Sequence, residues 1–250
     1  MRMSIDLYQP INVLKPVADD LWIIDGPLVR MAVGPTSIPF PTRAVVIRLS
    51  SGGLWVHSPT AELPEPLCDA LDQLGPVSHL ISPNALHYAG VPVWRARWPD
   101  AIAWSSPGVE KRARSQNIDV RFDRALDDQP PDEWSSSIDQ LIFRGSRWIE
   151  EVVFLHRPSR TLLLADLIEN FELDKVHGSI FKALLRAIGA CHPDGRAPLD
   201  FRATFVGRKD QARASFERMR AWEPERVIMA HGRWYERDGG AELDRAFRWL

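Results

Sequence analysis

The sequence has few cysteines, no long apolar run and almost no net charge, and each shortage excludes a class of protein. Two cysteines, Cys68 and Cys191, are too few for a disulfide scaffold or a thiolate zinc site. No apolar segment approaches the roughly 18 residues that cross a bilayer, and the first residues lack a signal-like run, so we expect a cytoplasmic protein without a membrane partner. A net charge of −2 argues against a nucleic-acid partner.

Other common chemistries lack their signatures as well. The chain contains neither a Gly-x-Ser-x-Gly elbow nor a glycine-rich phosphate loop. Ser58 follows His57, but neighbouring strand residues point to opposite faces, so we do not expect these two side chains to pair. Basic residues gather between Lys182 and Arg220, and we interpret this run as a solvated face rather than an anion site.

The order of apolar segments predicts an α/β fold in one domain, residues 1–250, with two halves that divide near the polar stretch 127–137. Alternation and β-branched runs predict strands at 21–26, 44–49, 54–57, 77–81, 101–104, 138–143, 151–156, 161–166 and 226–230. Apolar stripes predict helices at 63–74, 91–98, 109–115, 180–188, 209–222 and 243–250. The proline-rich segment 27–41 is too long for a simple hairpin and is predicted as a loop that forms a flap.

Three polar residues follow predicted strands in positions typical of an α/β active site. His87 comes shortly after strand 77–81, Asp166 ends strand 161–166, and His231 follows strand 226–230. Loops at the carboxyl edge of a sheet share one mouth, which is where open α/β layers place their chemistry. Neutral imidazoles and a carboxylate are also the ligands that zinc and iron accept.

These segments resemble the metallo-β-lactamase superfamily, whose signature is His-x-His-x-Asp-His. In the stretch Ser82–Gly90, only His87 keeps that pattern. The triplets Leu164-Ala165-Asp166 and Ala230-His231-Gly232 match the family's bridging Asp and final His. With His57-Ser58-Pro59 and Pro83-Asn84-x-x-His87, the chain is similar to a branch of unknown function, DUF4336-like. The resemblance implies an αββα four-layer sandwich of two mixed sheets with helices outside.

The resemblance further implies one divalent metal ion, zinc before iron or manganese, with His87 and Asp166 as catalytic residues. Its expected ligands are three residues at strand ends, completed by one of three others: His87, Asp166 and His231, with His57, Asn84 or Glu151. His57 either coordinates or forms a hydrogen bond, and Asn84 either holds a neighbour or offers its carbonyl oxygen. Leu86 stands where the family places a ligand to a second metal, so a two-metal site is not expected.

The function that follows is metal-dependent hydrolysis of an ester, lactone, thioester or phosphoester in a small-molecule substrate. The alternative is a non-catalytic binding protein that keeps the fold without metal. Ten tryptophans fit either a ligand pocket or a homodimer surface and do not decide between them. The remaining histidines are interpreted as structural or solvated: His79, His156, His177 and His192.

Overall fold

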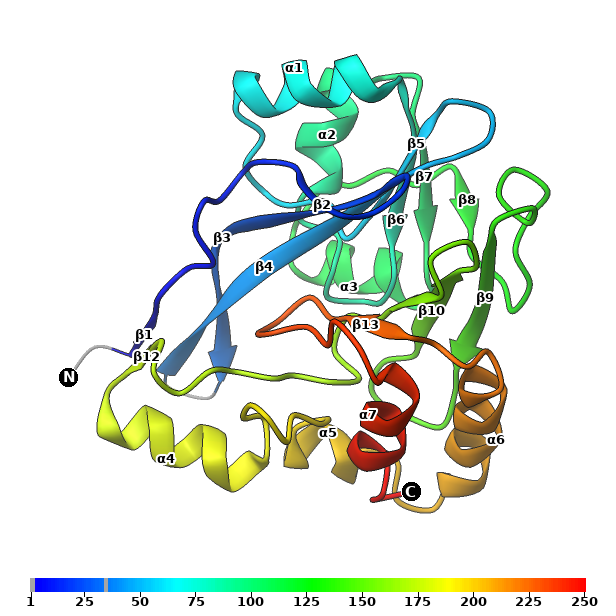
Figure 1. Ribbon diagram of the computed structural model, residues 1–250. Coiled ribbons are helices and arrows are strands. Elements are labelled where there is room, and N and C mark those ends of the chain that lie inside the picture. The colour runs from blue at the N-terminus through cyan, green and yellow to red at the C-terminus, as the bar shows by residue number, and fades with distance from the viewer. Residues whose placement is uncertain (1–2, 34–35) are drawn as a thin grey trace.

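Two mixed β-sheets packed face to face form the centre of the molecule, with helices on their outer faces (Figure 1). The computed structural model describes residues 3–33 and 36–250. Within them the larger sheet has the order β2 (Lys15–Ala18), β3 (Leu21–Val33), β4 (Thr36–Arg48), β5 (Leu54–His57), β6 (Val77–Ser82), β7 (Ile102–Ser105) and β8 (Arg124–Ala125). The smaller has the order β13 (Arg226–Ile228), β11 (Thr161–Leu163), β10 (Glu151–His156) and β9 (Ile138–Phe143). Strands β1 (Ser4–Ile5) and β12 (Val176–His177) form a separate pair.

Alternation along the strands separates the core into layers. On β4, Val45 and Ile47 belong to the cluster between the sheets, which also contains Phe154 and Leu163 of the smaller sheet. The intervening residues of β4 face the opposite way. They pack with α1 (Glu65–Leu74) and α2 (Val91–Arg97) in a second cluster. Helices α6 (Lys209–Arg220) and α7 (Gly239–Ala246) cover the outer face of the smaller sheet. The expected αββα order is therefore confirmed.

The remaining helices are α3 (Val109–Ser115), α4 (Ser179–Ile188) and α5 (Leu199–Ala203). Local signals place several ends: Pro64 precedes α1, and Gly189 adopts the left-handed conformation after α4. Helix α5 lies where the sequence predicted a loop. No helix in residues 3–33 or 36–250 combines the length and apolarity that a membrane span requires.

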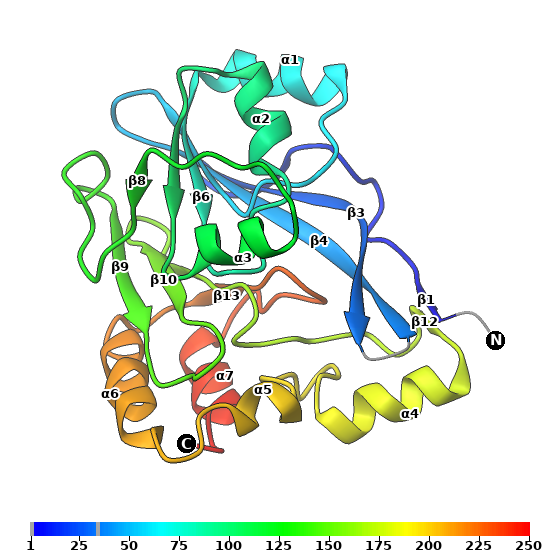
Figure 2. The same cartoon turned by 180° about the vertical axis from the view of Figure 1, so that it is seen from behind.

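The predicted proline-rich flap is wrong, because most of that segment is a β-hairpin arm. Strands β3 and β4 stay paired from Leu21–Ile47 out to Val33–Thr36, with a bulge between Asp25 and Leu28. Beyond the bulge, among the residues that the structure describes, each strand pairs only with the other, so Pro39 and Pro41 sit on strands with a free edge, where a missing N–H is tolerated. Figure 2 shows the arm reaching toward α4. Pro35 lies outside the described residues.

Two pairs of parallel strands, one in each sheet, bring the candidate residues together. Strands β5 and β6 run parallel, and so do β11 and β13. Parallel neighbours end at the same edge of a sheet. The segments after β5 and β6 carry Ser58 and His87, and those after β11 and β13 carry Asp166 and His231. Because the sheets pack face to face, all four loops share one rim.

The inter-sheet core predicts a clear contrast between two isoleucine substitutions. Ile47 is fully buried between the sheets, so Ile47→Ala should lower the free energy of unfolding by about 2–5 kcal/mol. Ile180 on α4 is 83% exposed, and Ile180→Ala should change it by no more than about 0.5 kcal/mol. Urea unfolding followed by tryptophan fluorescence measures both. Equal effects would contradict this division of the core.

Candidate functional site

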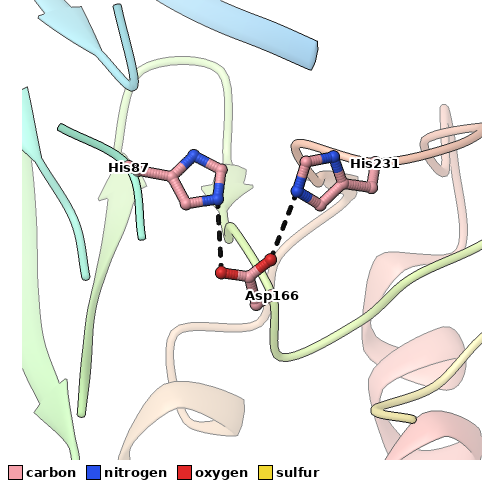
Figure 3. Close-up of side chains that lie close together, drawn as sticks. All are labelled: His87, Asp166 and His231. Carbon is pink, nitrogen blue, oxygen red and sulfur yellow. Dashed lines mark ion pairs between the residues drawn. The ribbon is translucent and has the colours of Figure 1, made fainter. Parts of the chain in front are cut away.

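His87, Asp166 and His231 form a compact cluster in the shared rim (Figure 3). His87 Nε2 lies 3.2 Å from Asp166 Oδ2, and His231 Nε2 lies 3.3 Å from Asp166 Oδ1. The ligand atoms of the three residues all lie within 4.8 Å of one another, and the side chains are only 7–10% exposed. Residues up to 144 positions apart (87 to 231) thus meet around one carboxylate.

The outer nitrogen of each imidazole is held by a neighbour. His231 Nδ1 donates to the Pro41 carbonyl oxygen at 2.7 Å, which fixes a proton on that nitrogen. His87 Nδ1 lies 2.6 Å from Ser58 Oγ. Both Nε2 atoms therefore point at the carboxylate. A lone pair on Nε2 would repel the carboxylate oxygen, so a proton or a metal cation is required between the two groups.

Loop anchors fix the position of His231. Arg43 Nη1 donates to the carbonyl oxygens of Met229 and Gly232, which flank the histidine, at 2.9 Å each. Gly232 has φ +92°, and a Cβ there would lie 2.2 Å from the Asn170 carbonyl oxygen. A glycine is needed at this turn because a side chain would displace the histidine loop.

Asn84 and Glu151 brace Asp166 from behind. Asn84 Nδ2 donates to Asp166 Oδ2 at 2.7 Å and to Glu151 Oε2 at 2.9 Å. Asn84 Oδ1 accepts the Leu86 N–H. The Glu151 carboxylate accepts the backbone N–H groups of Ala165 and Asp166 at 2.7 and 2.8 Å. Because these contacts occupy both side chains, the structure places them behind the cluster, although the sequence suggested them as ligands.

The charges of the cluster depend on one another. Burial alone would raise the pKa of Asp166, but the adjacent imidazoles of His87 and His231 hold it well below its usual range. Burial opposes protonation of His231, yet the Asp166 carboxylate raises its pKa overall. Burial and then the negative charge of Asp166 raise the pKa of Glu151. Of the two acids, Asp166 and Glu151, it is therefore Asp166 that carries the negative charge, between the two imidazoles.

The donor set of this cluster fits one transition-metal ion. Ligands at about 2.0–2.2 Å in a tetrahedron lie roughly 3.3–3.6 Å apart. Here the two imidazoles contact different oxygens of Asp166, and one ligand atom from each residue lies within 4.8 Å of the others, so side-chain movements of about 1 Å would bring all three to one ion. Fixing Nδ1 by a hydrogen bond leaves Nε2 for the metal, as is usual for ligand histidines. Leu86 packs against the core of the smaller sheet and supplies no ligand for a second ion.

His57 lies apart from the cluster, in an aromatic pocket. Its ring stacks on Trp55 with centroids 6.0 Å apart and meets the edge of Phe154 at 5.7 Å. Its buried Nε2 has no hydrogen-bond partner among the described residues. Burial, followed by the nearby charge of His87, lowers its pKa to about 3. The His57 imidazole is therefore uncharged at neutral pH and forms part of the apolar surroundings of the site.

Sequence reasoning missed two side chains of the site. Ser58 was considered only as a partner of His57, whereas the turn after β5, with Ser58 at φ +53°, directs its hydroxyl to His87. Glu169 was not considered, although it follows Asp166 by three positions. Its buried carboxyl has a pKa raised to about 8 by burial and by the charges of Asp166 and Asp200. In the sequence, only the position of Glu169 on the same loop as Asp166 could have indicated that it belongs to the site.

His57 predicts a specific pH dependence of stability. An unfolded histidine titrates near pH 6.5, so between that value and about 3 the unfolded state binds more protons. The stability that neutral His57 contributes is thus lost as the pH falls below about 6.5. The difference in unfolding free energy between wild type and His57→Phe should shrink by about 2 kcal/mol from pH 7 to pH 5. Urea unfolding at both pH values measures it, with the half-exposed His177→Phe as the control that should show no such change.

The solved structures to which the chain is similar are metallo-β-lactamases. That from Erythrobacter litoralis, with β-mercaptoethanol in its active site, gives a TM-score of 0.62 at 12% identity, covering 96% of this chain and 99% of that one. That from Pontibacter korlensis gives 0.59 at 12% identity, covering 97% and 100%. FIM-1 from Pseudomonas aeruginosa, in its mono-zinc form, gives 0.60 at 10% identity, covering 92% of each. At such identities the likeness shows the fold.

The sequence itself matches one family profile. Among curated proteins, the comparison found no match. The profile described as a domain of unknown function, DUF4336, matches residues 19–183, a span that includes Ser58, His87 and Asp166. The chain, which has the metallo-β-lactamase fold, therefore belongs to the DUF4336 family.

Proposed function

We propose that the chain binds one divalent metal ion through His87 Nε2, the Asp166 carboxylate and His231 Nε2, and hydrolyses a small-molecule ester, lactone, thioester or phosphoester. The observation that carries the proposal is the convergence of two oriented imidazoles on one buried carboxylate. Two imidazoles and a carboxylate suit zinc, and also iron or manganese. The mono-zinc form of the similar FIM-1 fold supports the choice of zinc.

The bound ion would supply Lewis acidity, which lowers the pKa of a water molecule and polarises the scissile group. The protein residues would divide the remaining work. Ser58 and the Pro41 carbonyl orient the two imidazoles through Nδ1. Asp166 stays ionised beside them, so its oxygens can accept a hydrogen bond that orients the attacking water. We assign a catalytic role to His87 as well as to Asp166. Ser58 contacts Nδ1 of His87, the nitrogen that faces away from Asp166.

Asn84 and Glu151 act in this proposal as positioning residues rather than ligands. Their hydrogen bonds fix the rotation of the Asp166 carboxylate and the backbone that carries it. Partners of this kind typically change metal affinity by about 10–100-fold. His57 contributes a dry, uncharged wall next to His87.

The alternative function is a non-catalytic binding protein that keeps the fold. The burial of all three cluster side chains, each at most 10% exposed, favours it, because a substrate must reach the ion. Leu86 favours it as well, since the residue cannot activate water. Metal content and turnover separate the two functions.

Purified without added metal and then titrated with zinc, the protein should bind about one equivalent. His87→Ala, Asp166→Asn and His231→Ala should each lower zinc affinity by more than about 100-fold, because each removes a ligand. His177→Ala, which removes a half-exposed histidine far from the cluster, should not. Elemental analysis and isothermal titration calorimetry measure stoichiometry and affinity. Less than about a tenth of an equivalent, before and after soaking, would contradict the metal site.

Neighbouring glutamates provide a matched test of the positioning residues. Glu151→Gln replaces one carboxylate oxygen with an NH2 group, which then faces the backbone N–H of Ala165 or of Asp166 without an acceptor, so zinc affinity should fall by about 10–100-fold. Glu150→Gln changes the same charge at a side chain 30% exposed and should leave the affinity unchanged. Equal affinities for the two variants would remove Glu151 from the site.

Hydrolysis is tested with p-nitrophenyl acetate, a lactone, a thioester and bis(p-nitrophenyl) phosphate. At least one should be hydrolysed by the zinc-loaded protein and not after chelation. Asp166→Asn should then lower kcat/KM by about 10²–10⁴-fold, since it removes the negatively charged ligand that also orients the water. A protein that binds zinc tightly yet hydrolyses none of the four would favour the binding function.

A further inference from the structure

A positively charged hollow lies between the segment after α4 and the C-terminal end of α7, apart from the His87–Asp166–His231 cluster. It has a volume of about 340 Å³ and is lined by Asp194, Arg196, Arg245, Ala246, Arg248 and Trp249. Figure 1 shows α5, α7 and the C-terminus gathered in this part of the molecule. The volume falls at the lower end of the range for small-ligand sites.

The lining carries an excess of positive charge. Three of the lining residues are arginines and one is an acid, and Glu242 pairs with Arg245, which leaves an excess of one positive charge. The carboxylate is Asp194, whose side chain is 81% exposed and stands 3.8 Å from Arg245 Nη1. Arg202 is close enough that the charge of Arg196, after burial, lowers its pKa. Gathering cations in this way costs electrostatic free energy that an anion would offset.

One of the three arginines is held rigidly and two are free to bind. Arg245 donates to the Gly195 carbonyl at 2.9 Å, the Tyr235 hydroxyl at 2.7 Å and Glu242 at 2.8 Å. Within residues 3–33 and 36–250, the side chains of Arg196 and Arg248 have neither an ion pair nor a hydrogen bond. Both are exposed, so their donors are open to a ligand.

The Trp249 indole adds an aromatic surface to the lining. Phe205 meets its ring edge-on with centroids 5.1 Å apart, and Lys209 Nζ lies 5.7 Å from its centroid. These contacts hold the ring in place beside the guanidinium groups. Flat aromatic ligands stack on such a fixed ring.

We propose that this hollow binds a small aromatic molecule that carries a phosphate group, with the phosphate on Arg196 and Arg248 and the ring against Trp249. A phosphate monoester carries a charge of about −1.5 to −2 at neutral pH, which is opposite in sign to the excess charge of the lining. Guanidinium groups bind phosphate oxygens in pairs through two parallel N–H donors. The site is independent of the proposed metal.

Calorimetric titration of the chelator-treated protein with phenyl phosphate and with inorganic phosphate tests this proposal. Chelation removes metal, so phosphate cannot bind through an ion at the other site. Phenyl phosphate should bind the wild type, and inorganic phosphate should bind more weakly. The double variant Arg196→Ala with Arg248→Ala should lose at least about tenfold in affinity for both, because charge-assisted hydrogen bonds are removed.

Two controls keep the result specific. Arg114→Ala with Arg121→Ala removes the same charge on and after α3 and should leave both affinities unchanged. Trp249→Leu should weaken phenyl phosphate alone, provided that its melting temperature shows a folded protein. Absence of phenyl phosphate binding to the wild type at about 10 mM would overturn the proposal. Equal losses in the two double variants would overturn it too, since binding would then follow net charge.

Discussion

The negative charge of Asp166, buried between His87 and His231, is the interaction on which the rest of the site depends. A carboxylate at this depth is costly unless cations or donors surround it. Here two imidazole nitrogens stand 3.2 and 3.3 Å from its oxygens, and Asn84 donates at 2.7 Å. The same arrangement brings two imidazole nitrogens and a carboxylate oxygen within 4.8 Å of one another, so the residues that stabilise the buried charge also have the donor set of a metal site.

The fold supplies that convergence through strand direction. Each sheet contains a parallel pair that ends at the rim, β5 with β6 in the larger sheet and β11 with β13 in the smaller. Packing the sheets through a common apolar cluster then brings the two rims together. The hairpin arm contributes as well, because the Pro41 carbonyl at its base accepts the proton of His231 Nδ1. The mixed topology of the two sheets therefore produces both the layered fold and the position of the site.

Two residues that differ from the metallo-β-lactamase signature, Asn84 and Leu86, are linked to each other and to Asp166. Leu86 fills space in the core, and the backbone N–H of the same residue is held by Asn84. Asn84 in turn links Glu151 to Asp166. A position that bears a ligand in the superfamily signature thus belongs here to a network that orients one carboxylate. In the proposed function this network orients the ligands of one ion, whereas a two-metal site would need a further ligand at Leu86.

The sequence by itself determined the local elements and the candidate cluster. Strand 54–57 and helix 109–115 have the predicted ends, because alternation, proline and glycine act over a few residues. His87, Asp166 and His231 were identifiable because strand ends are readable along the chain. Only the tertiary structure decided that residues 27–41 are mostly an arm, that Ser58 meets His87, and that Arg196 joins Arg248. Those contacts depend on pairing and packing between distant segments, for which no local pattern exists.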